Sequence, residues 1–76
     1  MLNLTKEQRL FLKENFKNAE KMMETDSVRD ILMPLDALIT YKGFDDDYVL
    51  TKWGNVAQRM YDDIYMQNVK EYNHGE

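Results

Sequence analysis

The sequence predicts an all-α protein, and three observations support this fold class. One proline and three glycines are spread over 76 residues, so few residues interrupt regular structure. No segment shows the alternation of a β-strand, whereas three segments repeat apolar residues with a helical period. Each of the three also begins with residues typical of a helix N-terminus. We therefore expect a small antiparallel three-helix bundle, with helices at about 6–24, 28–42 and 46–68.

The first predicted helix, residues 6–24, opens at Thr5. The Thr5 hydroxyl can accept a free backbone N–H, and Gln8 can reach back to complete a capping box. One face of the helix then collects Phe11, Leu12, Phe16, Ala19, Met22 and Met23. Leu10 falls among lysines, because three consecutive helical residues cannot all point inward. We expect Leu10 to be exposed.

The second predicted helix, residues 28–42, follows Ser27, which is placed to cap it, with Asp30 at the third helical position. Its apolar stripe consists of Val28, Ile31, Leu32, Leu35, Leu38 and Ile39. Pro34 removes one backbone hydrogen bond inside this segment. Because the stripe keeps its phase across the proline, we expect one helix kinked at Pro34. Gly43 is placed to end it in the left-handed conformation.

The third predicted helix, residues 46–68, follows three consecutive aspartates at 45–47. With the first of them as N-cap, the next two lie in the first turn, where the helix dipole stabilises each by roughly 0.3–1 kcal/mol. Phe44 and Val49 then have the spacing of a hydrophobic staple. The helix carries the widest stripe: Val49, Leu50, Trp53, Val56, Ala57, Met60, Tyr61 and Ile64. The stripe stops before residues 67 and 68, where we expect packing to end.

A metal site is the alternative interpretation of the aspartates at 45–47, and Asp62 and Asp63 raise the same question. Adjacent side chains diverge, and neither the alternating acids of a calcium loop nor a Glu-x-x-His motif is present. The chain also has no cysteine, one serine and one histidine, which leaves little material for nucleophilic catalysis. We therefore expect no enzyme, no cofactor and no small-molecule substrate. A divalent-metal-dependent hydrolase that uses these acids stays an alternative.

The charge distribution bears on the partners of the chain. Its formal net charge is −4, and residues 25–76 hold five Lys/Arg against ten Asp/Glu. Nucleic-acid phosphates require the opposite sign, and a recognition helix opening at residues 45–47 would present aspartates to them. Both points count against a dimeric transcription regulator, which stays a second alternative function. A basic protein surface suits the charge better. No apolar run approaches the ~20 residues that cross a bilayer, so we expect a soluble cytoplasmic protein and no membrane partner.

We expect a single helical domain over residues 1–69 and a frayed C-terminal tail over 70–76, which includes the only histidine, His74. Tyrosine and methionine residues beyond the apolar stripes are candidates for partner binding, because both types are enriched in interfaces. With the exposed leucine of the first helix, the candidates are Leu10, Tyr41, Tyr48, Tyr65 and Met66. The tyrosines could equally edge the core with their hydroxyls in water.

The function that these features favour is protein–protein interaction by a small acidic non-enzymatic protein, such as an inhibitor, an immunity factor or an assembly accessory. A homodimer is one arrangement that would cover surplus apolar surface, since domains of this size often need that support. The many Lys, Asn and Tyr residues are typical of small reading frames in AT-rich bacteria, their mobile elements or phage.

Overall fold

The computed structural model describes residues 2–69, which form four α-helices: α1 (Lys6–Asn15), α2 (Ala19–Glu24), α3 (Arg29–Lys42) and α4 (Lys52–Val69). These residues contain no strand, only an isolated antiparallel bridge between Phe44 and Leu50. The all-α prediction is confirmed. None of the four helices combines the length and the apolar character needed to cross a bilayer. The predicted tail with His74 lies outside the described residues.

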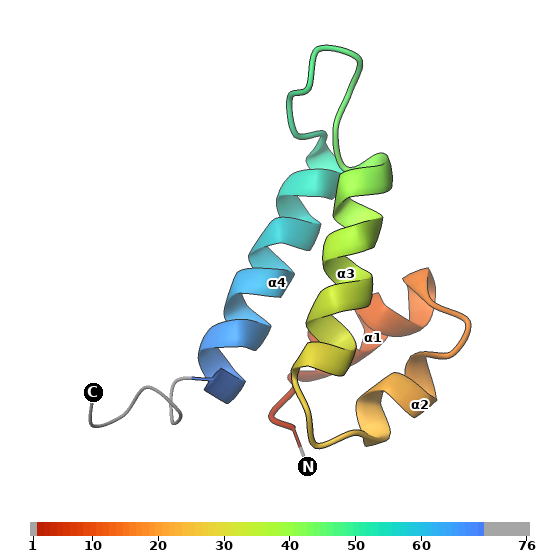
Figure 1. Ribbon diagram of the computed structural model, residues 1–76, viewed down its shortest axis with the longest axis vertical. Coiled ribbons are helices and arrows are strands. Elements are labelled where there is room, and N and C mark those ends of the chain that lie inside the picture. The colour runs from red at the N-terminus through yellow and green to blue at the C-terminus, as the bar shows by residue number, and fades with distance from the viewer. Residues whose placement is uncertain (1, 70–76) are drawn as a thin grey trace.

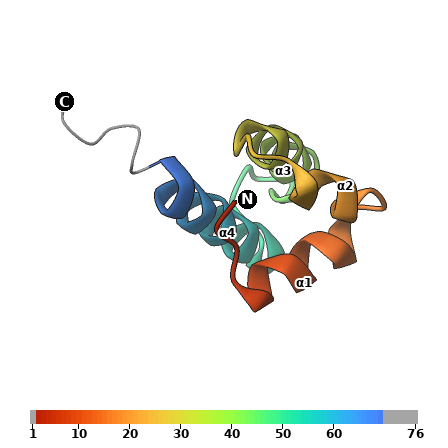
Figure 2. The same cartoon turned by 90° about the horizontal axis from the view of Figure 1, so that it is seen from below.

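The two long helices, α3 and α4, are antiparallel neighbours that set the long axis of the molecule (Figure 1). The short helices α1 and α2 lie against the part of this pair where α3 begins, and the view from below shows them closing one side of it (Figure 2). The connection between α3 and α4, residues 43–51 and hereafter the tip loop, extends beyond the opposite end. The two ends of the helix pair therefore differ: one is covered and the other is not.

The single helix predicted over residues 6–24 is wrong, because the chain leaves the helix at Phe16 and re-enters it at Ala19. Phe16 has an extended backbone, with φ −132° and ψ 129°. Just before it, Asn15 Nδ2 donates to the carbonyl oxygen of Phe11 at 2.8 Å, a side-chain bond back onto the last turn of α1. Because of this break, α2 can change direction and pack against α3 as well as against α1.

The predicted helix caps are confirmed at α1 and corrected at α3. Thr5 Oγ1 accepts from the backbone N–H of Gln8 at 3.1 Å, and Gln8 Oε1 accepts from Thr5 N–H at 2.9 Å, which completes the capping box. Ser27 does not cap α3. Instead the Thr25 hydroxyl accepts from the Ser27 N–H and donates to the Asp30 carboxylate at 2.6 Å, so the threonine organises the approach to the helix.

Helix α3 runs through Pro34 as one helix, as predicted, and the kink at this residue stays a prediction. Its end differs from the expectation, since Gly43 has the right-handed φ of −83° and not a left-handed one. Glycine is required there for space, because a Cβ would lie 2.5 Å from the carbonyl oxygen of Ile39. A Cβ on Gly54 of α4 would in the same way collide with the carbonyl oxygen of Gly43. The missing Cβ of Gly54 lets α4 approach the end of α3 closely beneath the tip loop.

The core lies between the four helices and uses most of the predicted stripes. Leu12, Ile31, Leu35 and Ile64 are fully buried. The other buried apolar residues are Phe11, Ala19, Met22, Met23, Val28, Leu32, Ile39 and Ala57. Two predicted members of the third stripe are wrong: Val49 is 58% exposed and Val56 is 49% exposed. Val49 belongs to the tip loop, and Val56 lines an open depression between α1 and α4.

Packing does not end at residues 67 and 68 as predicted, because amide side chains continue it. Buried Gln8 donates through Nε2 to Gln67 Oε1 at 2.9 Å, and Gln67 Nε2 donates to the carbonyl oxygen of Asn3 at 2.9 Å. Asn68 accepts from the Asn3 N–H at 2.6 Å and donates to its carbonyl oxygen at 2.9 Å. The segment before α1 is thereby held on the last turns of α4.

Candidate protein-binding surface

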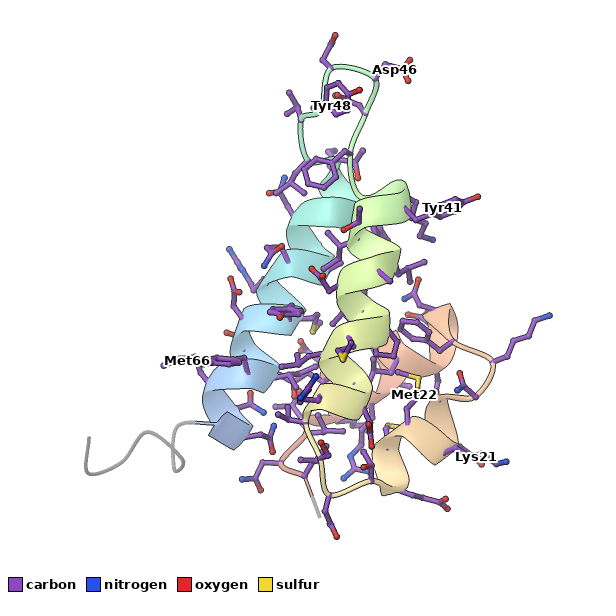
Figure 3. All side chains as sticks on the ribbon, viewed as in Figure 1. Lys21, Met22, Tyr41, Asp46, Tyr48 and Met66 are labelled. Atoms are coloured by element: carbon purple, nitrogen blue, oxygen red, sulfur yellow. The ribbon has the colours of Figure 1, made fainter. Side chains whose placement is uncertain are left out.

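The tip loop presents apolar side chains to solvent. Tyr48 is 88% exposed, Val49 is 58% exposed and Phe44 is 42% exposed. Tyr48 lies near the far end of the loop, away from every helix (Figure 3). Single exposed apolar residues are ordinary on a protein surface, but three within six positions mark this protruding loop as a candidate for contact with another molecule. We refer to these three side chains as the apolar trio.

Asp45 organises the backbone of this loop. Its Oδ1 accepts from the N–H of Asp47 at 2.8 Å and from that of Val49 at 3.1 Å. Its carbonyl oxygen accepts from Tyr48 N–H at 3.0 Å, and its own N–H donates to the Val49 carbonyl oxygen at 2.9 Å. Such side-chain bonds to nearby backbone groups are what aspartate contributes to turns. The loop is therefore ordered by its own hydrogen bonds.

The prediction that Asp45 caps the last helix is wrong, and with it the start at residue 46 and the hydrophobic staple. Helix α4 begins at Lys52, after the loop. The capping interaction belongs to Thr51, whose Oγ1 accepts from Gly54 N–H at 2.9 Å. The aspartate accepts backbone N–H groups, as expected, but in a turn. Because no helix begins at these aspartates, they would not face DNA from a recognition helix, and the net charge is the remaining objection to a transcription regulator.

The base of the tip loop is closed and anchored. The N–H and the hydroxyl of Thr51 both donate to the carbonyl oxygen of Gly43, at 2.8 and 3.2 Å. In the first turn of α4, the Trp53 ring stacks on Phe11 of α1 with the ring centroids 6.0 Å apart. Lys42 places its Nζ 4.4 Å from the centroid of the same indole ring, a cation–π contact. The loop thus projects from a rigid platform.

Tyr48 has a left-handed backbone, with φ 62°, and is the only non-glycine residue in the described part of the chain with a positive φ. For an L-residue this conformation costs about 1–2 kcal/mol, and glycine or asparagine is the usual occupant. The ring makes up for none of this by burial, since Tyr48 is the most exposed of the large apolar residues described. The fold holds an aromatic ring in solvent at an energetic disadvantage.

Asp46 and Asp47 precede Tyr48 in the tip loop, and Figure 3 shows Asp46 and Tyr48 near the far end of the loop. Neither carboxylate has a hydrogen-bond or ion-pair partner among residues 2–69. The same residues contain no group of three His, Cys, Asp or Glu side chains placed to hold a metal ion. The end of the loop therefore combines apolar side chains with two unpaired negative charges.

The five residues predicted to bind a partner are all exposed, but they do not form one surface. Tyr48 lies in the tip loop, Tyr41 projects sideways from the end of α3, and Met66 points away from the far side of α4 (Figure 3). Leu10, exposed as predicted, is on α1. Phe44 and Val49 were missed because the predicted staple placed them inside. A signal was available: one glycine and three aspartates within residues 43–47 are also typical of a turn.

A second apolar surface, hereafter the groove, lies between the start of α3 and the second half of α4. It encloses about 660 Å³ and is lined by Val28, Leu32, Met33, Tyr61 and Tyr65, with Asp26, Ser27 and Arg29 beside them. Tyr65 is the one predicted partner-binding residue found here. Met33, which is 61% exposed, was not predicted, although its position outside the stripe of α3 already turned it away from the core.

Comparison with known proteins does not extend this picture: no family model matches the chain, and neither the curated proteins nor the solved structures yield a significant match.

Proposed function

We propose that this chain is a cytoplasmic, non-enzymatic protein that acts by occupying a surface of another protein, as an inhibitor, an immunity factor or an assembly accessory does. The tip loop is its docking surface. The observation that carries the proposal is the exposure of the apolar trio, Phe44, Tyr48 and Val49, on a loop whose backbone is already closed by hydrogen bonds.

Burial of this trio against a partner would be favourable for two reasons. Each Å² of apolar surface removed from water contributes roughly 25 cal/mol. A preformed loop also loses little conformational entropy when it binds, so less of that gain is offset. Tyrosine is, in addition, one of the residue types that contribute most to binding at interface centres. Tyr48 and Val49 have more than half of their surface in solvent, so their position supports a role in binding.

A homodimer would have to use another surface. Two tip loops carry charges of the same sign, and like charges brought together disfavour association. The groove, with Met33 and Tyr65 at its surface, is the other exposed apolar region on which a second copy could pack. Sedimentation velocity over a range of concentrations tests this. A dimer that persists in a Tyr48→Ala variant uses a surface other than the tip loop.

Affinity purification from the source cells tests the docking surface. The tagged chain, its Tyr48→Ala variant and its Val56→Ala variant are compared; Val56 is exposed on α4, outside the tip loop. We expect a protein that is retained by the original chain and by Val56→Ala, and lost with Tyr48→Ala. Helical circular dichroism should be the same for all three chains. Retention by Tyr48→Ala at the original level would contradict the assignment.

The other predicted residues are examined in the same assay. Alanine at Leu10, Tyr41, Tyr65 or Met66 should leave the partner bound, because none of these residues belongs to the tip loop. If Leu10→Ala or Tyr65→Ala releases the partner and Tyr48→Ala does not, the docking surface lies on the helices.

A further inference from the structure

We infer that the partner surface recognised by the tip loop is a basic one: an apolar recess bordered by lysine or arginine side chains, into which Tyr48 inserts. This inference rests on the proposed function and specifies the chemistry of the partner. It follows from the exposed apolar trio, from the charges beside it and from the shape of the loop.

The charged residues of the tip loop determine which sign of charge the partner surface must carry. Within residues 43–51 there are three aspartates and no lysine or arginine. Asp45 is occupied by the backbone N–H groups of the loop, whereas Asp46 and Asp47 have no partner among residues 2–69. At the base of the loop, Lys42 lies over the Trp53 ring of α4, and this contact directs its charge toward the platform. The outer end of the loop is therefore negative.

Desolvation then limits which surface can cover the trio. A partner that buries Tyr48 and Val49 must also remove water from the carboxylates beside them. An unpaired carboxylate buried against apolar or acidic groups is strongly unfavourable, while a lysine or arginine neighbour offsets the lost hydration. Arginine is especially suited, since it pairs with carboxylates in a bidentate manner and stacks on aromatic rings. A neutral apolar surface would leave two charges uncompensated.

The shape of the loop points to a recess. The tip loop projects beyond the ends of α3 and α4, and Tyr48 is near its outermost part (Figure 3). A flat partner could contact the ring on one side only, whereas a recess can enclose a ring that is 88% exposed. Interface residues that contribute most to affinity are those that fill such pockets.

Selection from a displayed library of random disulfide-closed peptides tests this inference with a defined probe. We expect the enriched peptides to combine Lys or Arg with apolar residues and to bind the chain in a salt-sensitive manner. Tyr48→Ala should weaken binding by roughly thirtyfold or more, as for an interface residue of the strongest class. Asp46→Asn combined with Asp47→Asn should weaken it by roughly two- to tenfold at low salt, and less at high salt, because such pairs are screened. Met33→Ala, in the groove, is the matched control and should have no effect.

The other outcomes separate this inference from the proposed function. Peptides that bind the tip loop but are neutral or acidic, with affinity unchanged by salt, would overturn the basic partner and leave the docking surface in place. A selection in which no peptide depends on Phe44, Tyr48 or Val49 would overturn both. If sedimentation instead shows a self-association that Tyr48→Ala abolishes, the occupant is a second copy of the chain, and the basic partner is wrong.

Discussion

The two ends of the α3/α4 pair use the same kinds of apolar residue in opposite ways. At the end covered by α1 and α2, Leu12, Ile31 and Ile64 are fully buried. At the other end, Phe44, Tyr48 and Val49 are exposed on a loop held by hydrogen bonds. The first set is buried between the helices, whereas Tyr48 and Val49 have most of their surface in solvent. The backbone of the tip loop is ordered by hydrogen bonds that include the Asp45 carboxylate and the Thr51 hydroxyl, without burial of Tyr48 or Val49.

Truncation of a core residue should give the largest effect and tests the covered end. Leu35 is fully buried, and Leu35→Ala should lower the free energy of unfolding by about 2–5 kcal/mol, from lost burial and the cavity left behind. That is a large part of the roughly 5–15 kcal/mol that small domains have in total. Thermal unfolding followed by circular dichroism measures it, with Val49→Ala as a control that should change stability by less than about 0.5 kcal/mol. Equal effects would remove the contrast between the ends.

The close approach of α3 and α4 beneath the tip loop is tested by Gly54→Ala. In an open helix this change stabilises by up to about 1 kcal/mol. Here the new Cβ would collide with the carbonyl oxygen of Gly43, so we expect a loss of about 1–3 kcal/mol in urea unfolding, as for other overpacked sites. Asn55→Ala, at the next and exposed position, is the control and should be neutral or slightly stabilising. If Gly54→Ala instead raises the free energy of unfolding, the space between α3 and α4 can accommodate a Cβ and the close approach is wrong.

The buried amide pair offers a smaller and more specific effect. Gln8→Ala removes the capping-box partner of Thr5 and both hydrogen bonds between Gln8 and Gln67, at a cost of about 1–3 kcal/mol. Because the two glutamines share the same bonds, the double variant with Gln67→Ala should lose less than the sum of the single losses. Additive losses in urea titrations of the four chains would show that the two side chains act independently.

Tyr48→Gly should give the smallest change in stability and sharpens the description of the tip. Glycine relieves a left-handed conformation that costs about 1–2 kcal/mol, but its own flexibility when unfolded offsets about 0.5–1 kcal/mol. We expect stability to be unchanged or raised by up to about 1 kcal/mol, measured through the fluorescence of Trp53. A clear loss of stability would show that the tyrosine ring supports the fold, and would weaken its assignment to binding.

Much of the covered end could be predicted from the sequence. Helical periodicity identified the buried faces of α1, α2 and α3, and the capping box at Thr5 was visible from Gln8 three residues later. The break at Phe16 could not be predicted, because the periodicity of apolar residues does not distinguish one helix from two short ones that pack on the same core. The pairing of Gln8 with Gln67 was also hidden, since it joins residues far apart in the chain.

The sequence left the structure of the tip loop ambiguous, for a different reason. An aspartate can accept backbone N–H groups at a helix start or in a turn, and both are compatible with the residues around Asp45. Thr51 determines where the helix starts, because it caps α4 and at the same time donates a hydrogen bond to Gly43. That second bond depends on the place of α3 in three dimensions. The exposure of Phe44 and Val49, on which the proposed docking surface depends, follows from this choice.

The contact between Thr51 and Gly43 has a practical consequence. Because the donor and acceptor that close the loop are 2.8 Å apart, the segment between them starts and finishes at nearly the same point in space. Such a segment is portable: an unrelated helical hairpin with glycines at the matching crossing could receive residues 43–51 as a graft.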